Sequence, residues 1–269
     1  MSLNLENLTG EIEEWLEKAD EEENLKFIKQ KDSESGFFKN TVAIELLGYF
    51  GSVDRMIAKE VQKFSQKKKK LAGFFSSYFN EMVQLYSDEI LLPITLLHSQ
   101  IGSQDFIITT GSFAIPDVIS YQLAEELYDF YKKHKVSKIL LIDGVYNYQR
   151  QIDKKPQVHR ISTSESKIKV INEKKADFTL MGQIASSFLT YWSHDDNIPI
   201  EILVVDAFSE YDPVSSLELL KVLTEEWGIE GDFGELRRKS QEFIQSYMKS
   251  REEIKLERQK DVVDPRFFT

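Results

Sequence analysis

Apolar residues in the middle of the chain occur in short continuous runs, each followed by glycine and then by a stretch with helical periodicity. Residues 41–47 form the first run, and Gly48 and Gly51 follow it directly. Apolar positions across residues 53–64 then recur at spacings of three and four, which is the spacing of one helix face. This order predicts a buried strand, a glycine turn and a helix.

The same order recurs further along the chain. Residues 105–109 form a second apolar run that ends near Gly111, and a helix is expected after Pro116. Residues 138–143 form a third run, which ends at Gly144. Strands that are apolar at consecutive positions are typical of sheets covered by helices on both faces.

The second half of the chain adds a helix over residues 181–192 and a fourth strand over residues 200–205. Asp212 suits a helix cap, Pro213 suits the first helical position, and Gly228 suits the end of that helix. Alternating strands and helices predict parallel βαβ units with right-handed crossovers. The fold class is therefore α/β, with a three-layer, doubly wound, mostly parallel sheet covered by helices, as in phosphorylases and hydrolases.

The flanking segments differ from this core in composition. Residues 1–35 are dense in carboxylates, and they also carry a helical apolar stripe made of Leu5, Leu8, Ile12, Trp15 and Leu16. We interpret them as an acidic N-terminal helix and linker, with a frayed leader as the alternative. Residues 36–234 form the core domain, and residues 235–269 form a C-terminal helix and tail. The polar excursion over residues 145–178 is expected to contain a hairpin.

The composition excludes several classes of function. The chain has 269 residues and a formal net charge of −11, which gives no electrostatic support to nucleic-acid binding. It contains no cysteine, so disulfides and thiolate metal sites are absent. No apolar stretch approaches the roughly 18 residues of a membrane span. We therefore expect a cytoplasmic protein with neither a nucleic-acid nor a membrane partner. We interpret the four lysines at residues 67–70 as a solvated segment that leads into the next strand.

The strand ends offer only weak candidates for chemistry. The four histidines lack the spacing of a metal motif, and neither a phosphate loop nor a nucleophile elbow occurs, so no metal, cofactor or catalytic residue is assigned. Open α/β sheets usually bind ligands at the carboxyl ends of their strands. The weak ligand-pocket candidates are Gly48, Gly51, Gly111, Asp143 and Asp206. Tight turns and loop hydrogen bonds explain the same residues equally well.

Set in order, these segments resemble the archaeal members of the proteasome assembly chaperone family. The matching blocks are Asp-Phe-Ile-Ile-Thr-Thr-Gly at residues 105–111, Tyr-Gln-Leu-Ala at residues 121–124, and the strand with its glycine at residues 138–144. Ile-Pro-Ile at residues 198–200 and Glu-Tyr-Asp-Pro at residues 210–213 follow in the same order. The resemblance spans residues 41–250, and its specificity lies in the order of the blocks.

The resemblance implies a homo-oligomer without an established enzymatic role that assists assembly of the proteasome core particle by contacting its α-subunits. Family members can end in a hydrophobic residue, a tyrosine and any last residue, a tail that docks between α-subunits. The corresponding residues are Phe267, Phe268 and Thr269, and Phe268 departs from the pattern because it lacks the tyrosine hydroxyl. A nucleoside-phosphorylase or hydrolase-like enzyme with a site at the strand ends is the alternative, and a structural oligomer with another partner is a third possibility.

Overall fold

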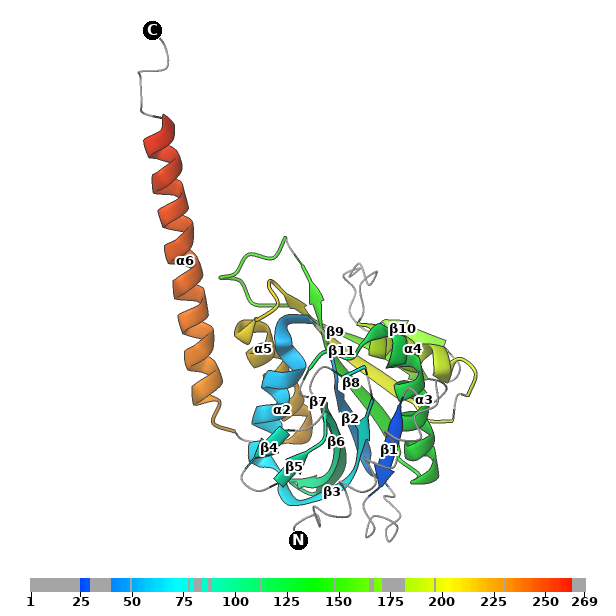
Figure 1. The fold of residues 1–269 in the computed structure, drawn as a ribbon. Helices are drawn as coiled ribbons and strands as arrows, with labels where there is room; N and C mark the ends of the chain where they lie inside the picture. The colour runs from blue at the N-terminus through cyan, green and yellow to red at the C-terminus, as the bar shows by residue number, and fades with distance from the viewer. Residues whose placement is uncertain are drawn as a thin grey trace.

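The computed structural model is a three-layer α/β fold with one long helix that extends beyond it (Figure 1). It describes residues 25–29, 40–48, 50–76, 78–79, 84–86, 89–111, 113–147, 149–164, 167–170, 182–195, 197–229 and 231–262. Within these residues, no helix is long and apolar enough to cross a membrane.

Nine strands form one sheet in the order β1-β3-β6-β7-β2-β8-β11-β9-β10. Their bounds are β1 (Lys26–Lys29), β2 (Val42–Leu46), β3 (Gln66–Phe75), β6 (Ile94–Ile101), β7 (Gln104–Gly111), β8 (Lys138–Tyr146), β9 (Val158–Ser164), β10 (Lys167–Val170) and β11 (Ile200–Ala207). The four central strands β7, β2, β8 and β11 are parallel, whereas the strands on both flanks are antiparallel. Strands β4 (Gln84–Tyr86) and β5 (Glu89–Leu91) form a separate hairpin.

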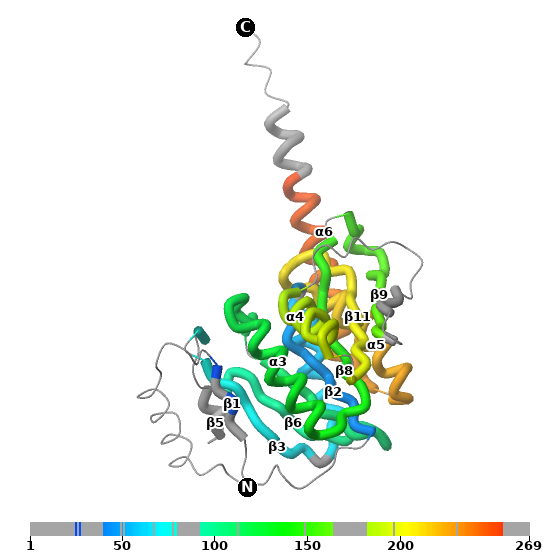
Figure 2. The backbone as a smooth tube through the Cα atoms, turned by 90° about the vertical axis from the view of Figure 1, so that its right-hand side faces the viewer, coloured from blue at the N-terminus to red at the C-terminus, as the bar shows by residue number. Residues whose placement is uncertain are grey.

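Helices cover both faces of the sheet (Figures 1 and 2). Their bounds are η1 (Phe50–Ser52), α2 (Val53–Phe64), α3 (Asp117–Lys133), α4 (Gln183–Trp192), α5 (Pro213–Trp227) and α6 (Gly234–Val262). Helices α2 and α5 pack on one face with the first part of α6, and α3 and α4 pack on the other. The predicted helix-covered α/β fold is confirmed. The sheet is mixed rather than mostly parallel, because three of its strand pairings are parallel and five are antiparallel.

The continuous apolar runs are explained by two hydrophobic cores, one on each face of the sheet. Ala43 of β2 faces the α3 and α4 layer, and the next residue, Ile44, faces the α2 and α5 layer. All eight residues of β11 are buried. Successive side chains of a strand point to opposite faces of the sheet. A strand that is covered on both faces therefore shows no alternation of apolar and polar residues.

The local signals at helix α5 are also confirmed. Asp212 accepts hydrogen bonds from the backbone N–H groups of Val214 at 3.1 Å and Ser215 at 3.0 Å, and Pro213 occupies the first turn. Gly228 ends the helix in the left-handed conformation, with φ of 62°. These contacts satisfy donors and acceptors that a helix end leaves without intrahelical partners.

The structure departs from the expected sheet at its β1 side. The lysines at residues 67–70 lie inside β3 rather than before a strand, because β3 begins at Gln66. The prediction that these lysines are solvated residues leading into a strand was therefore wrong, because they belong to the strand itself. Strand β1 belongs to the sheet, although residues 26–29 fall in the segment expected to be a linker. The antiparallel strand β6 was not predicted, and it joins β3 to the parallel centre.

The excursion after β8 contains the expected hairpin. Strand β9 runs antiparallel to β11, and β10 pairs with β9 at the edge of the sheet. The intervening loop, residues 147–157, lies at the end of the sheet where β8 and β11 finish. The asparagine at its start is anchored, because the backbone N–H of Asn147 donates to the carbonyl of Ala207 at 2.9 Å.

Helix α6 packs against α5 at its start and then rises away from the core (Figures 1 and 2). Its first turn is joined to α2 by Glu235, whose carboxylate lies 3.4 Å from the ammonium groups of both Lys59 and Lys63. Further along, the Ser240 hydroxyl donates to the carbonyl of Pro213 at 2.8 Å. By contrast, the seven consecutive residues from Met248 to Ile254 are all exposed.

Candidate functional site

Asp143, a predicted ligand-pocket candidate, is held by backbone groups at the end of β8. Its Oδ1 accepts from the N–H of Gly144 at 2.8 Å, and its Oδ2 accepts from the N–H of Gly182 at 2.9 Å. A Cβ atom would lie 2.3 Å from Oδ2 if it were added at Gly182, and 2.7 Å from Oδ1 at Gly48. Both glycines are therefore required by the close approach of this carboxylate, which joins β8 to the start of α4.

The structure brings Gly48 and Asp143 together, but it places the other candidates elsewhere. Gly51 lies in η1, on the turn into α2. Gly111 ends β7 beside Leu47, whose Cδ2 would be 3.1 Å from an added Cβ. Asp206 lies in β11 with a different set of partners. No group of three or more His, Cys, Asp or Glu side chains that could hold a metal ion occurs among the described residues.

Asp206 is bonded to the excursion loop and to β9. Its Oδ2 accepts from the Asn147 side-chain amide at 3.1 Å, and its Oδ1 lies 3.3 Å from Nε2 of His159. Its backbone carbonyl accepts from Nη1 of Arg150 and from the Ser215 hydroxyl, both at 2.6 Å. All of these groups belong to segments that meet at the end of β11, so Asp206 acts as a connection between them.

Arg150 is the central residue of this connection, and sequence reasoning did not identify it. Its guanidinium is buried, lies 2.8 Å from Asp212 Oδ2, and also donates to the Ser215 hydroxyl. Asp212 is the same residue that caps α5. A buried arginine with a buried carboxylate is stable only when hydrogen bonds compensate the loss of water. Here both carboxylate oxygens and both Nη atoms are bonded, whereas Nε of Arg150 has no partner among the described residues. The loop of residues 147–157 is thereby joined to both β11 and α5.

One further acidic residue at this end of the sheet was not predicted. Asp54, in the first turn of α2, is buried, and its Oδ1 has no hydrogen-bond partner among the described residues. Burial raises the pKa of Asp54 from 3.8 to about 7, and the negative charge of Asp143 adds to the shift. An Asp in the first turn of a helix is common on surfaces, so no sequence pattern indicates that this one is buried.

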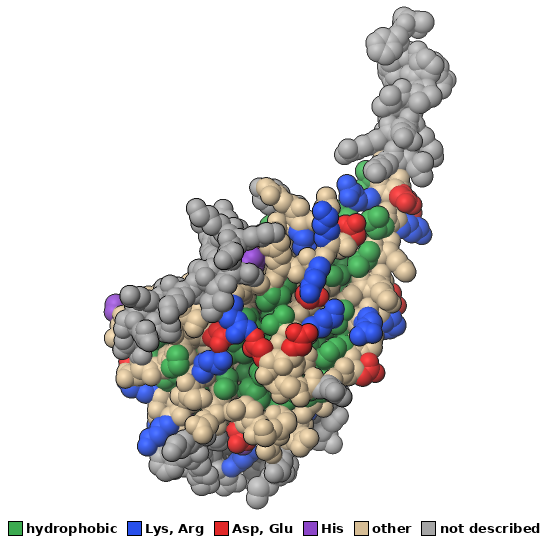
Figure 3. All heavy atoms as spheres, turned by 180° about the vertical axis from the view of Figure 1, so that it is seen from behind, with side chains coloured by type: hydrophobic (Ala, Val, Ile, Leu, Met, Phe, Trp, Pro, Cys, Tyr) green, Lys and Arg blue, Asp and Glu red, His purple; other side chains and the backbone are tan. Residues whose placement is uncertain are grey.

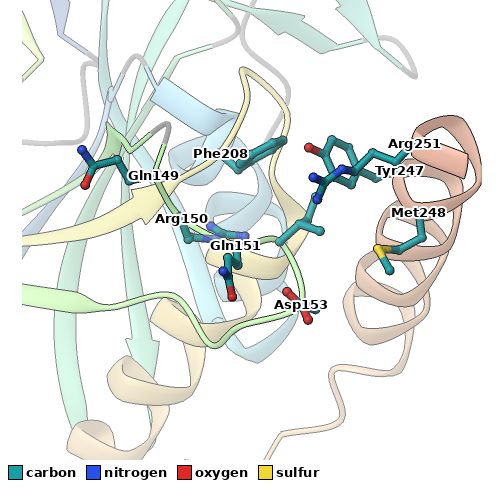
Figure 4. A pocket seen from close by; sticks show the side chains of 9 residues that line it. Gln149, Arg150, Gln151, Asp153, Phe208, Tyr247, Met248 and Arg251 are labelled. Atoms are coloured by element: carbon teal, nitrogen blue, oxygen red, sulfur yellow. The ribbon is translucent and has the colours of Figure 1, made fainter. Parts of the chain in front are cut away.

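The hollow that stands out in the described part of the chain lies between the excursion loop and α6, away from Asp143. It is a groove of about 460 Å³ (Figure 4). Phe208 and Tyr247, which both line it, are in edge-to-face contact, with ring centroids 4.9 Å apart and planes at 84°. Met248 and Arg251 line the α6 side, and Asp153 lines the loop side. We call this hollow the α6 groove.

The α6 groove is an amphipathic surface. Met248 is 43% exposed although it is apolar. Arg251 and Asp153 are also exposed, and neither makes an ion pair with a side chain that the structure describes. Seen from behind, hydrophobic side chains gather along the side from which α6 rises, with Lys and Arg side chains around them (Figure 3). Such a surface suits a polypeptide segment better than a small metabolite.

The comparisons with known proteins decide the family. The model of the PAC2 family matches residues 63–250. The chain belongs to the PAC2 family. The match covers every element from β3 to the first half of α6, including Asp143 and Arg150, and it ends one residue before Arg251 of the α6 groove. No significant match was found among curated proteins.

Solved structures share the fold of this PAC2 protein at low sequence identity. Pyrococcus furiosus PbaB, an archaeal proteasome activator, matches with a TM-score of 0.67 and 19% identity, over 85% of this chain and 99% of that chain. Pyrococcus furiosus PbaA, an archaeal homolog of proteasome-assembly chaperone, matches with a TM-score of 0.64 and 15% identity, over 88% and 96%. A Corynebacterium glutamicum protein of unknown function matches with a TM-score of 0.65 and 14% identity, over 90% and 98%.

The tail residues Phe267, Phe268 and Thr269 lie outside the described residues. Their docking therefore stays a prediction, as does the role of the acidic residues 1–24. The described part of the chain ends at Val262, the last residue of α6.

Proposed function

We propose that this PAC2 protein is a proteasome assembly chaperone-like protein that binds α-subunits of the proteasome core particle. The observation that carries the proposal is the match of the family model over residues 63–250, together with a fold shared with PbaA and PbaB. Contact with the partner is made by the surface of the protein, and it requires no cofactor. The proposal places the protein in the cytoplasm as a homo-oligomer.

The C-terminal tail is the proposed anchor for the α-subunits. Phe267 and Phe268 offer two adjacent aromatic side chains, which can bury a large area at a small cost in conformational entropy. Pro265 restricts the backbone just before them. Because Phe268 lacks a hydroxyl, the pocket that receives it has to be apolar, or a buried polar group there would lose its partner.

Binding to purified α-subunits tests the proposal. The full chain and a Phe267→Ala, Phe268→Ala variant are titrated against immobilised α-subunits, and we expect the variant to bind at least tenfold more weakly. Val118→Ala, Tyr121→Ala is the matched control, because it removes two exposed apolar side chains of α3 and should leave binding unchanged. Absence of binding by the full chain would refute the partner. Equal binding by the tail variant would refute only the anchor.

A nucleoside-phosphorylase or hydrolase-like activity is the second candidate, and Asp54 is the observation that favours it. A buried carboxyl group with a raised pKa at the carboxyl end of a parallel sheet is the kind of group that serves as a general acid or base. Against it, the carboxylate of Asp143 is engaged by two backbone N–H groups. Thermal stabilisation by nucleosides or phosphate would support this candidate, because a ligand that binds only the native state raises its stability.

A further inference from the structure

The α6 groove has a charge pattern that restricts what can bind in it. Its apolar part is formed by Phe208, Tyr247 and Met248. Its exposed charged groups are Arg251 and Asp153, because Arg150, which also lines it, is buried and paired with Asp212. These two charged groups come from opposite walls, α6 and the excursion loop (Figure 4). A segment that fills the groove should therefore carry a bulky apolar side chain together with one group of each charge.

Two segments outside the described residues combine adjacent phenylalanines with charges of both signs. Residues 30–39 are one of them, but both of their ends are fixed, after β1 and before β2, at the end of the sheet opposite the groove. The C-terminal segment is the other. Residues 264–268 read Asp-Pro-Arg-Phe-Phe, with one anion, one cation and two adjacent aromatic residues. The acidic residues 1–24 fit less well, because they carry many carboxylates, which Asp153 would repel, and Lys18 as their single cation. Aromatic rings pack well against a methionine sulfur and against other rings, so the groove and the segment also match in their apolar parts.

The length of α6 determines which copy of the segment can reach the groove. Tyr247 precedes Val262 by 15 residues, which is about 22 Å of helix at about 1.5 Å per residue. Phe268 follows Val262 by 6 residues, which span at most about 21 Å when extended, and a reversal of chain direction uses about four of them in a turn. A chain that reversed direction at the end of α6 would therefore fall short of the apolar part of its own groove. The C-terminal segment of a second copy is not restricted in this way, because it does not have to turn back along the same α6.

We propose that residues 264–268 of one copy bind in the α6 groove of a second copy. Phe267 or Phe268 packs between Phe208 and Met248. Asp264 of the segment faces Arg251, and Arg266 faces Asp153. Reciprocal exchange of the two segments gives a closed, isologous pair.

Peptide binding to the full chain tests the inference. The protein used is the full chain with Phe267→Ser and Phe268→Ser, so that its own tail does not compete and every described residue is unchanged. A labelled peptide of residues 260–269 is titrated by fluorescence anisotropy at about 0.15 M salt. We expect saturable binding by the natural peptide, and none by a peptide in which both phenylalanines are alanine.

A charge reversal locates the binding site. Arg251→Glu should weaken binding of the natural peptide about fivefold, the size expected for an exposed ion pair. A peptide with Asp264→Lys should bind the Arg251→Glu protein better than the natural peptide does. Arg237→Glu is the matched control, because it makes the same charge change at an exposed residue near the start of α6, away from the groove. Binding of the natural peptide to that variant should be unchanged.

The same two phenylalanines are the proposed anchor for the α-subunits, so the groove of a second copy and the α-subunits compete for the tail. The outcomes of the two sets of experiments are distinct, because no α-subunit is present here. Absence of peptide binding, or equal binding to the Arg251→Glu and Arg237→Glu proteins, would overturn the inference. Displacement of the labelled peptide by a peptide of residues 1–24 would assign the groove to the acidic N-terminal segment instead. In sedimentation, the natural chain should be a larger species than the Phe267→Ser, Phe268→Ser chain, and equal sizes would also contradict the exchange.

Discussion

Glu45 is a carboxyl group in the middle of the sheet, and it forms no ion pair with a residue that the structure describes. It lies on β2, is 1% exposed, and shares a hydrogen bond with the hydroxyl of Tyr131 from α3. That hydroxyl also lies 2.7 Å from Oγ1 of Thr109, whereas Oε2 of Glu45 has no partner among the described residues. Burial raises the pKa of Glu45 from 4.5 to about 7, and the two hydroxyl groups oppose the shift only in part.

The raised pKa predicts that this residue makes the folded protein less stable as pH rises. Between pH 4.5 and about 7, the folded state keeps the proton that the unfolded state has already lost. The free energy of unfolding therefore falls by about 1.4 kcal/mol for each pH unit in this window. Over 2.5 pH units the loss is about 3 kcal/mol, and it is complete above about pH 7, where both states are ionised.

Substitution of Glu45 by glutamine removes this titration while keeping the shape of the side chain. The free energy of unfolding of the Glu45→Gln and natural proteins is measured by urea denaturation at several pH values from 5 to 8. The difference, variant minus natural, should rise by about 2.5 kcal/mol from the acidic to the basic end of this range, because part of the loss lies below pH 5. The titration of Asp54 occurs in both proteins and cancels in that difference.

A matched control separates this effect from a general loss of charge. Glu242 is exposed on α6 beside Arg238. Glu242→Gln therefore makes the same chemical change as Glu45→Gln, but at a carboxylate on the surface. Its stability difference from the natural protein should be nearly independent of pH. A pH-independent difference for Glu45→Gln as well would show that Glu45 is ionised in the folded state at pH 5, and the account of its burial would be wrong.

Three further substitutions test the contacts at the strand ends. Arg150→Ala should lower the free energy of unfolding by about 3–5 kcal/mol, because it leaves the carboxylate of Asp212 buried without its partner; urea denaturation measures this loss. Asp212→Asn in the Arg150→Ala background should recover part of it, and a further additive loss would contradict the pairing. Gly182→Ala should lower the thermal midpoint, because the new Cβ would lie 2.3 Å from Asp143; an unchanged midpoint would argue against that close approach.

The parallel centre of the fold could be predicted because both of its faces are covered by helices. Strands β2, β8 and β11 are apolar at nearly every position for that reason, and such runs are visible in a sequence. The cap at Asp212 and the end at Gly228 could be predicted because each depends on one residue type in one conformation. These signals are local, so no knowledge of distant contacts was needed.

The β1 side of the sheet could not be predicted in the same way. Strand β3 begins with a glutamine and four lysines, a composition that strands generally avoid, and it is fixed by its pairing with β6. The lysines are tolerated in the strand because they lie near its start, where Lys68 and Lys69 are exposed. That pairing joins residues far apart in the sequence, and no local pattern encodes it.

The site was harder to predict than the fold, because a polar residue at a strand end can face either a ligand or its own chain. Asp143 and Asp206 were singled out by their position, and both prove to be hydrogen-bonded to neighbouring segments of the protein. The deciding partners, Gly182 and Arg150, lie about 40 and 60 residues away in the sequence. Where buried carboxylates are engaged in this way, the groups left to meet a partner are those on the exterior, and in this molecule they gather where α6 leaves the core.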